Sequence, residues 1–404
     1  MPINRGGHLR YNEYARERRQ LTWREGLSAE QLQVRTLVSR AKLSSTRPLV
    51  KCQLGIGPIS FRHNSCSGCS LPDSQLDGPW NDLCSRLEQV ARRTPVPLRP
   101  LRIGTRGSPM ALRQTALVAD RLTAAHPNLA AIGAIEIVTI RTTGDRVQDR
   151  LLDEIGGKGL FAKEIEEALL AGHIDFAVHS LKDLETWLPD RLAVACVLPR
   201  DDPRDALLSA QPTSLASLPT GARVGTASLR RQAQLLRRRP DLVVVPIRGN
   251  VNTRMRKLDA GDVDALVLAL CGLERLGEAG RAVEILSREA MLPAVGQGAL
   301  AIECRAEDEM VRQLVEPLHD AVSAACVGAE RAMLAALDGS CRTPIAGLAE
   351  IEGGRLRLEG LLLKPDGSDE IRGRREGGIR DAAALGTELG RELRRRAGPG
   401  FGLS

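Results

Sequence analysis

Aromatic side chains are scarce in this sequence of 404 residues, and they are unevenly placed. They make up 2% of the chain, and five of the nine stand before residue 99. A protein that binds single-stranded nucleic acid by stacking bases needs an aromatic platform, so this class is disfavoured. The core of the remaining chain is expected to be aliphatic, built from Leu, Val, Ile and Ala.

Long apolar runs are also missing. No stretch approaches 18 consecutive apolar residues, which excludes a membrane-spanning helix. The nine cysteines are an odd number, and the sequence shows no secretory signal peptide. Free thiols in a reducing compartment are therefore expected, and not a disulfide framework.

What the chain does contain is typical of a large globular protein. Its length allows two or three domains, and 43% apolar with 26% charged residues is ordinary. The net charge of +7 and the pI near 9.1 indicate an anionic partner, either nucleic acid or a small polyanion. Net charge is the main argument for nucleic acid, so the small polyanion is favoured.

Residues 1 to about 98 differ from the remainder. They hold 15 Lys and Arg against 8 Asp and Glu, with runs of Ser, Pro and Gly and one predicted helix around Ser28 to Lys42. An organellar transit peptide, a disordered tail and sequence translated from a start codon set too early are the alternatives, and the last two are favoured. Cys66 and Cys69 lack a second ligand pair, so no zinc site is expected there.

Phe176 to Asp183 is the most informative stretch of the chain. An apolar, β-prone run ends in several polar or ionisable residues, as when a strand of an α/β protein brings side chains to its carboxyl edge. Asp183 is of interest because the polar residues elsewhere are mostly cationic. The alternative is that Lys182 and Asp183 only cap the next turn.

Two parts of the chain share one pattern of strand, loop and helix. In the first, a strand at Leu101 is followed by Ser108 as N-cap and Pro109 at the start of a helix running to about Ala125. In the second, a strand at Arg223 is followed by a similar loop and helix. Two α/β lobes around a cleft are therefore predicted, followed by a compact α+β domain.

The domain boundaries follow from these patterns. Residues 200–205 look like a crossing between lobes, and the glycine-rich stretch 292–303 looks like the return. The predicted divisions are residues 1–98 as an extension, 99–198 with 299–318 as domain 1, 199–298 as domain 2 and 319–404 as domain 3.

Basic residues gather on the loops that follow strands in both lobes. Because such loops converge on one crevice and the arginine fork suits carboxylates, a cleft for a small polycarboxylate is predicted. Surface ion pairs would explain any single one of these residues. The basic residues are Arg106, Lys158, Lys182, Arg230, Arg231, Arg248 and Arg254.

Cys341 differs from the cysteines in apolar patterns. It lies in a polar turn beside Arg342, where a thiolate is favoured. By spacing alone it could also be an exposed but idle thiol. The cysteines expected to be buried fillers are Cys196, Cys271, Cys304 and Cys326.

Residues 101 to about 396 resemble the porphobilinogen deaminase family, also called hydroxymethylbilane synthases. The resemblance rests on seven motifs that occur in order. They are Arg106-Gly-Ser-Pro-Met-Ala-Leu, Gly156-Gly-Lys-Gly-Leu-Phe161, Val178-His-Ser-Leu-Lys-Asp183, Gly225-Thr-Ala-Ser-Leu-Arg-Arg231, Arg248-Gly-Asn-Val-Asn-Thr-Arg254, Leu292-Pro-Ala-Val-Gly-Gln-Gly298 and Gly339-Ser-Cys341.

The resemblance implies a fold and a reaction. The fold is two lobes like those of type II periplasmic binding proteins plus a small α+β domain. The reaction joins four porphobilinogen molecules head to tail into hydroxymethylbilane with loss of ammonia, for tetrapyrrole biosynthesis. It starts from a dipyrromethane cofactor held by a thioether to the loop cysteine, here Cys341. A monomer without metal, nucleic acid or membrane partners is implied; the location is cytoplasmic, or organellar if residues 1–98 are a targeting signal.

The resemblance also assigns roles to residues of this sequence. Asp183 matches the catalytic aspartate, although Leu184-Glu-Thr follows it where the family often shows Val-Pro-Thr. The implied cofactor-binding residues are Cys341, Arg106, Ser108, Lys182, Asp183, Ser228, Arg230, Arg231, Arg248, Gly249 and Arg254. The implied substrate-binding residues are Arg106, Gln114, Lys158, Phe161, Ser180, Arg248, Arg254, Arg275 and Gln297.

A binding protein without chemistry is the chief alternative. Two lobes around an anion site would suffice for a receptor of the periplasmic type. Such a receptor needs no third domain with Cys341, and it would be expected to carry an export signal. Both features favour the enzyme.

Overall fold

The structure is a computed structural model, and it describes three stretches of the chain: residues 99–146, 161–339 and 343–401. The chain divides into two compact units, Met1–Leu87 and Glu88–Ser404, and every described residue belongs to the second. The predictions made for residues 1–98, Lys158 and Cys341 therefore lie outside the described residues. Among the described residues, no helix combines the length and apolarity that crossing a membrane requires.

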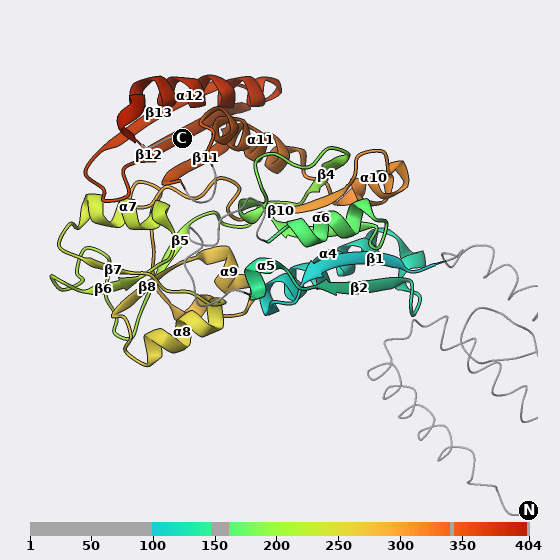
Figure 1. Cartoon of the computed structure of the whole chain (residues 1–404), viewed down its shortest axis with the longest axis horizontal. Coiled ribbons are helices and arrows are strands. Elements are labelled where there is room, and N and C mark those ends of the chain that lie inside the picture. The colour runs from blue at the N-terminus through green and yellow to red at the C-terminus, as the bar shows by residue number, and fades with distance from the viewer. Residues whose placement is uncertain (1–98, 147–160, 340–342, 402–404) are drawn as a thin grey trace, which may run out of the picture. The chain divides into compact units, whose positions relative to one another are not determined.

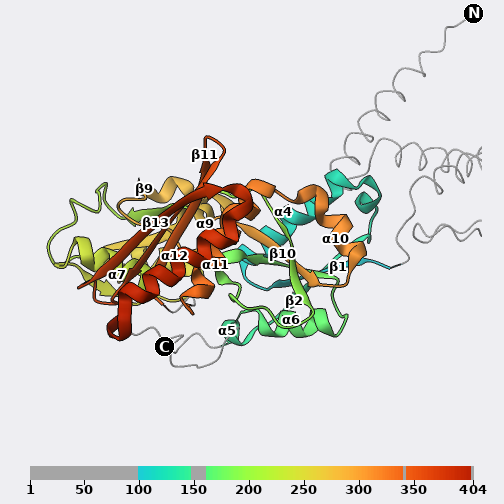
Figure 2. The same cartoon turned by 90° about the horizontal axis from the view of Figure 1, so that it is seen from above.

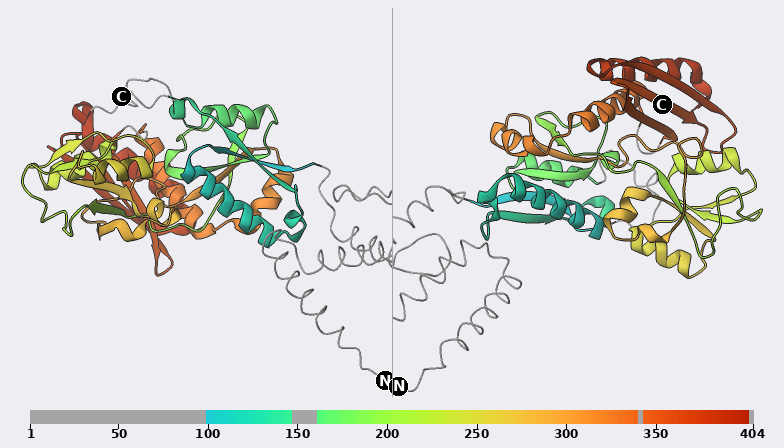
Figure 3. Two further views of the ribbon diagram at one scale, coloured as in Figure 1. Left: turned by 90° about the horizontal axis from the view of Figure 1, so that it is seen from below. Right: turned by 180° about the vertical axis from the view of Figure 1, so that it is seen from behind.

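The first lobe is built on a five-stranded mixed sheet with the order β2-β1-β3-β10-β4. Its strands are β1 (Leu101–Arg106), β2 (Ile135–Ile140), β3 (Phe176–Ser180), β4 (Leu192–Val197) and β10 (Leu300–Arg305). Strands β1, β2 and β3 are parallel, whereas β10 runs antiparallel to both β3 and β4. Its helices are α4 (Pro109–Ala125), the short α5 (Thr143–Arg146), α6 (Lys163–Leu170) and α10 (Glu309–Val315). Figures 1 and 3 show β10 in orange among the green strands of this lobe.

The second lobe repeats this arrangement with the order β7-β6-β8-β5-β9. Its strands are β5 (Asp205–Ser209), β6 (Arg223–Gly225), β7 (Val243–Val245), β8 (Ala265–Ala269) and β9 (Ala282–Ile285). Its helices are α7 (Leu229–Arg238), α8 (Val251–Asp259) and α9 (Leu270–Arg275). In each sheet the strand that enters from the other lobe, β10 or β5, is the antiparallel one. The predicted pair of similar lobes is confirmed.

The C-terminal part is a three-stranded antiparallel sheet covered by two helices (Figure 2). Its elements are α11 (Ala321–Ala336), β11 (Ile345–Glu352), β12 (Arg355–Leu363), β13 (Glu370–Gly378) and α12 (Ala382–Ala397). Gly386 and Gly390 let the two helices approach closely, because a Cβ at either position would meet a carbonyl oxygen of α11 at 2.1 and 2.5 Å. The predicted α+β domain is confirmed, and with it the fold class. Strand β13 was not predicted, because its charged sequence lacks apolar alternation.

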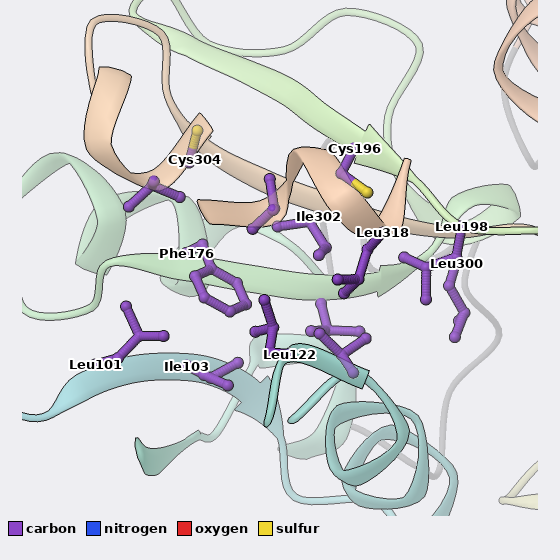
Figure 4. Packing of buried hydrophobic residues seen from close by; sticks show 14 of the residues in the cluster. Leu101, Ile103, Leu122, Phe176, Cys196, Leu198, Leu300, Ile302, Cys304 and Leu318 are labelled. Atoms are coloured by element: carbon purple, nitrogen blue, oxygen red, sulfur yellow. The ribbon is translucent and has the colours of Figure 1, made fainter. Parts of the chain in front are cut away.

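The core of the first lobe is almost entirely aliphatic, as predicted (Figure 4). Ile103, Leu122 and Ile302 pack there around Phe176, the one aromatic side chain in this cluster. The cysteines expected to be fillers are buried as free thiols: Cys196, Cys271, Cys304 and Cys326. Burial raises the pKa of the Cys196 thiol to about 12, so this group is inert at neutral pH.

The chain crosses between the two lobes twice, as the sequence indicated. Strand β4 ends at Val197 in the first sheet and β5 begins at Asp205 in the second. The return leads from β9 to β10 through a glycine-rich segment. Gly298 in this segment has a φ of +92°, and a Cβ there would meet the carbonyl oxygen of Asp201 at 2.4 Å. The two crossings therefore lie against each other, and we propose the domain boundaries given above from these strand positions.

Candidate active site

Asp183 lies directly beyond the carboxyl end of β3. The strand is buried except at its last residue, and a 3₁₀ turn, Leu181–Asp183, follows it. Leu181 and Leu184 are buried on either side, whereas Asp183 is exposed. Within the described part of the chain, its carboxylate has no hydrogen-bond or ion-pair partner, so it does not cap the turn. The carboxylate is therefore available to a ligand.

Lys182 points back into the protein and joins Asp183 to the two crossings. Its Nζ donates to Oε1 of Gln297 at 3.3 Å. The fully buried Gln297 in turn donates to the carbonyl oxygen of Pro203 at 2.6 Å and to Oδ1 of Asp205 at 2.9 Å. Burial lowers the pKa of Lys182, while the charge of Asp183 opposes this shift. A chain of contacts thus connects the turn of the candidate catalytic residue with the start of β5.

Arg230 and Arg231 are almost fully buried and share Asp205. Nη2 of Arg230 lies 2.8 Å from Oδ2 of Asp205, and Nη2 of Arg231 lies 2.8 Å from Oδ1. Burial alone would raise the pKa of Asp205, but the two arginines bring it well below its usual range. These two arginines are therefore paired, as the alternative interpretation of the sequence allowed, but the pairs are buried and not on the surface.

Arg248 stands at the tight turn before α8, and Arg254 lies in the first turns of that helix. Gly249 has a φ of +107°, and a Cβ there would meet the side chain of Thr253 at 2.7 Å, so only glycine fits. Its carbonyl oxygen accepts from Nε of Arg254 at 2.8 Å. Burial lowers the pKa of Arg254 to about 10, neighbouring arginines add to this, and Asp183 opposes it. Nη1 of Arg248 is buried without a hydrogen-bond partner in the described structure.

Further predicted residues lie at the ends of β1 and β3. The guanidinium of Arg106 sits 4.1 Å from the centre of the Phe161 ring, a cation–π contact. Nε2 of the buried Gln114 donates to Oγ of Ser180 at 2.8 Å. Ser108 caps α4, since its Oγ accepts from the backbone N–H of Ala111 at 3.2 Å. The predicted strand–loop–helix opening is confirmed down to the last residue of the helix, Ala125.

Arg275 is engaged with acceptors on the two crossings. Its guanidinium donates to Oδ2 of Asp201 at 2.8 Å and to the carbonyl oxygen of Gly298 at 2.7 Å. It therefore holds the two crossings together. It also lines, with Pro109 and Gly277, a hollow of about 470 Å³.

Comparison with known proteins gives the family. A family model described as "Porphobilinogen deaminase, dipyromethane cofactor binding domain" matches residues 101–313. A second, described as "Porphobilinogen deaminase, C-terminal domain", matches residues 324–395. The chain belongs to the porphobilinogen deaminase family. The first model spans both lobes, so the lobes form the dipyrromethane-binding part of the family's architecture.

Porphobilinogen deaminases of known sequence match most of the described chain. The one from Nitrobacter hamburgensis is 56% identical over 299 residues, which is 74% of this chain and 94% of the relative. The one from Paracoccus denitrificans is 55% identical over 307 residues, 76% of this chain and 97% of the relative. "Porphobilinogen deaminase, chloroplastic" from Oryza sativa is 50% identical over 304 residues, 74% of this chain and 85% of the relative.

Among solved structures, the periplasmic VFT2 domain of BvgS from Bordetella pertussis matches 57% of this chain and 89% of its own, with 16% identity and a TM-score of 0.33. The fold is defined by the strand orders of the two five-stranded sheets.

The structure brings several of the residues expected from the porphobilinogen deaminase family into one network. The charge of Asp183 acts on both Lys182 and Arg254, and Gln297 connects Lys182 to Asp205. Arg275 is engaged at the crossings instead. Ser228 serves as the N-cap of α7, accepting from the backbone N–H of Arg231.

Glu330 is a buried carboxylate that the sequence did not single out. It lies on α11, and its two oxygens accept from Nη1 of Arg200 at 2.6 Å and from the backbone N–H groups of Gly296 and Ala349 at 2.7 and 2.8 Å. One side chain thus joins both crossings to the C-terminal sheet. The residues around Glu330 in this alanine-rich helix did not indicate such a role, because the partners of its carboxylate are remote in sequence.

A second unpredicted cluster is buried behind β3. His179 Nε2 lies 3.0 Å from Oε2 of Glu303 on β10, and Glu166 on α6 faces the same pair. All three side chains are buried. Burial raises the pKa of Glu166 to about 7, and the charge of Glu303 adds to the shift. Two carboxyl groups so placed cannot both ionise without cost.

Glu166→Gln should make folding less dependent on pH. The folded state keeps the Glu166 proton up to pH 7, whereas the unfolded chain releases it near 4.5, so stability falls as pH rises between these values. The Glu166→Gln variant carries no such proton, so this fall in stability with rising pH is absent from it. Its free energy of unfolding relative to wild type should increase by roughly 3 kcal/mol from pH 4.5 to pH 7.5, measured by urea titration. Glu167→Gln, an exposed neighbour, serves as the control; equal pH profiles for the two variants would contradict the assignment.

Proposed function

We propose that this chain is a porphobilinogen deaminase enzyme that joins four porphobilinogen molecules into hydroxymethylbilane. One observation carries the proposal: Asp183, just beyond the carboxyl end of β3, is exposed and has no partner among the described residues, and its charge acts on Lys182 and Arg254. Porphobilinogen bears an acetate and a propionate next to an aminomethyl group on a pyrrole. Such a substrate needs cations for its carboxylates and one carboxylate for the charge that develops on its ring.

The residues present fit a dipyrromethane cofactor. Nη1 of Arg248 is buried without a partner, and Nη1 of Arg231 makes no hydrogen bond to any described residue, although the rest of that guanidinium binds Asp205. These atoms, with Arg254, would hold carboxylates of the cofactor, and the thiolate of Cys341 would carry it as a thioether. When bound, the dipyrromethane supplies the pyrrole carbon to which the first substrate is joined.

Asp183 has the central role in the proposed mechanism. Its free carboxylate accepts a hydrogen bond from the pyrrole N–H of the substrate and orients the ring. As ammonia leaves the aminomethyl group, positive charge develops on that ring, and the adjacent negative charge stabilises it. The same carboxylate is placed to take up a proton when the pyrrole becomes aromatic again. Arg106, at the end of β1 and in contact with the Phe161 ring, carries a positive charge that suits a substrate carboxylate.

The test is the intact mass of the purified protein beside its Cys341→Ser variant. Wild type should carry the added mass of two linked pyrrole units, and the variant should not. Incubation with porphobilinogen should then give wild-type species heavier by further pyrrole units. A wild-type protein that stays unmodified after this incubation would contradict the proposed enzyme and favour a binding protein without chemistry. The expectations of a monomer, of no metal or nucleic-acid partner and of a cytoplasmic location stay predictions.

A further inference from the structure

The segment that follows Asp183 is held by one side chain of the C-terminal domain. Arg331 lies on α11 and donates only to main-chain carbonyl oxygens of this segment. The distances are 3.3 Å from Nη1 to Leu184, 2.6 Å from Nη2 to Glu185 and 3.1 Å from Nη2 to Thr186. Three consecutive carbonyl oxygens held by one guanidinium fix the direction in which the chain leaves the turn.

Two further contacts hold the same turn, one on α11 and one on the residues that follow this helix. Leu181 and Leu184, which bracket Lys182 and Asp183, share a buried apolar cluster with Val327 of α11. Oγ1 of Thr186 also donates to the carbonyl oxygen of Gly339 at 3.2 Å. The turn is thus held from its apolar side and from its main chain, while the carboxylate of Asp183 remains free.

The surroundings of Arg331 disfavour the positive charge of its guanidinium. Burial lowers the pKa of its guanidinium, and the charges of Glu303 and Glu185 oppose this shift. A buried guanidinium loses hydration, so its hydrogen bonds to the three carbonyl oxygens replace that hydration. Because the hydrogen bonds go to carbonyl oxygens, they do not require particular side chains at 184 and 185, where the sequence departs from the common pattern of the family. The charge of Glu185 adds an attraction to these hydrogen bonds.

We propose that Arg331 is a positioning residue for the condensation reaction, holding the turn of Asp183 against helix α11 so that the carboxylate keeps its place relative to the bound rings. The inference rests on the proposed function, since it assigns a role through Asp183. Arg331 itself does not touch the reacting atoms. A displacement of the turn by about 1 Å is enough to slow an oriented reaction by up to 10²-fold.

The experiment compares Arg331→Met with Arg331→Lys, and uses Arg391→Met as control. Methionine keeps the apolar stem and removes the donors, lysine keeps a charged donor, and Arg391 is an exposed arginine on α12 without a hydrogen bond to a described residue. The measurements are kcat and KM for porphobilinogen per cofactor-loaded molecule, with loading taken from the intact mass. Arg331→Met should lose about 10- to 100-fold in kcat with KM changed less than about threefold. Arg331→Lys should recover part of the loss, and Arg391→Met should match wild type.

A purely structural role predicts a different result. Loading and melting temperature would then fall, while the loaded molecules kept the wild-type kcat, and this outcome would overturn the proposal. If Arg331→Met does not fold, Thr186→Val gives the same test through the contact to Gly339, with a smaller expected loss in kcat. An inactive wild type without added mass would mean that the proposed function has failed. An active wild type with a fully active Arg331→Met would mean that only the positioning role has failed.

Discussion

Asp183→Asn should fold normally and lose turnover by about 10²- to 10³-fold or more. Asparagine keeps the size of the side chain and can still accept a hydrogen bond from a pyrrole N–H. It has no negative charge, so it can neither stabilise the charge that develops as ammonia leaves nor take up the ring proton. Because Asp183 is exposed and has no partner among the described residues, the free energy of unfolding should change by less than about 0.5 kcal/mol.

The measurement is the rate of porphobilinogen consumption per cofactor-loaded molecule, with the melting temperature recorded on the same samples. Asp190→Asn is the matched control, because Asp190 is an exposed aspartate on the same connection between β3 and β4. The control should keep the wild-type rate. If Asp183→Asn retained more than about a tenth of the activity, the catalytic role assigned to its charge would be wrong.

Asp205→Asn should cause the largest loss of stability of any single charge removal in the second lobe. Asp205 is fully buried and takes hydrogen bonds from Arg230, Arg231 and Gln297. The substitution leaves two guanidinium groups, 4% and 6% exposed, without their counter-charge. Removing one partner of a buried ion pair costs about 3–5 kcal/mol, which corresponds to a drop in melting temperature of roughly 5–15 °C.

Asp241→Asn provides the comparison for that result. Asp241 pairs with Arg239 at 2.6 Å, closer than the 2.8 Å of the Asp205 pairs, but both side chains of this pair reach solvent. Its loss should cost much less stability than the loss of Asp205, since water replaces the partner. Denaturant titrations of the two variants at neutral pH decide the point. Equal losses would mean that burial is not what makes the Asp205 pair important.

The elements around the candidate site were largely predictable because their signals are local. Ser108 followed by proline fixes where α4 begins, and the apolar run before Asp183 places this carboxylate beyond a strand. Gly249 was recognised from its motif, and the positive φ explains why glycine stands there. Each of these features depends on residues within a few positions of one another, which is the range over which capping, turn geometry and periodicity act.

The pairing of the arginines was not predictable in the same way. Arg230, Arg231, Arg248 and Arg254 all lie in polar motifs at the starts of helices, and nothing in their neighbourhoods distinguishes them. The structure distinguishes them by their partners. Asp205, 25 residues before Arg230, lies on the antiparallel strand β5 and pairs with the arginines of α7. Nη1 of Arg248 has no such partner among the described residues.

The sequence by itself determined the family, the two similar lobes, the aliphatic core and the position of Asp183 at a strand end. Tertiary structure alone decided which cations are committed to ion pairs, how Glu330 joins both crossings, and that Arg331 holds the turn of Asp183. The physical reason is the range of the forces involved. Caps, turns and apolar periodicity are properties of neighbouring residues, whereas a buried charge takes its partner from whatever the folded chain places beside it, here up to 147 residues away.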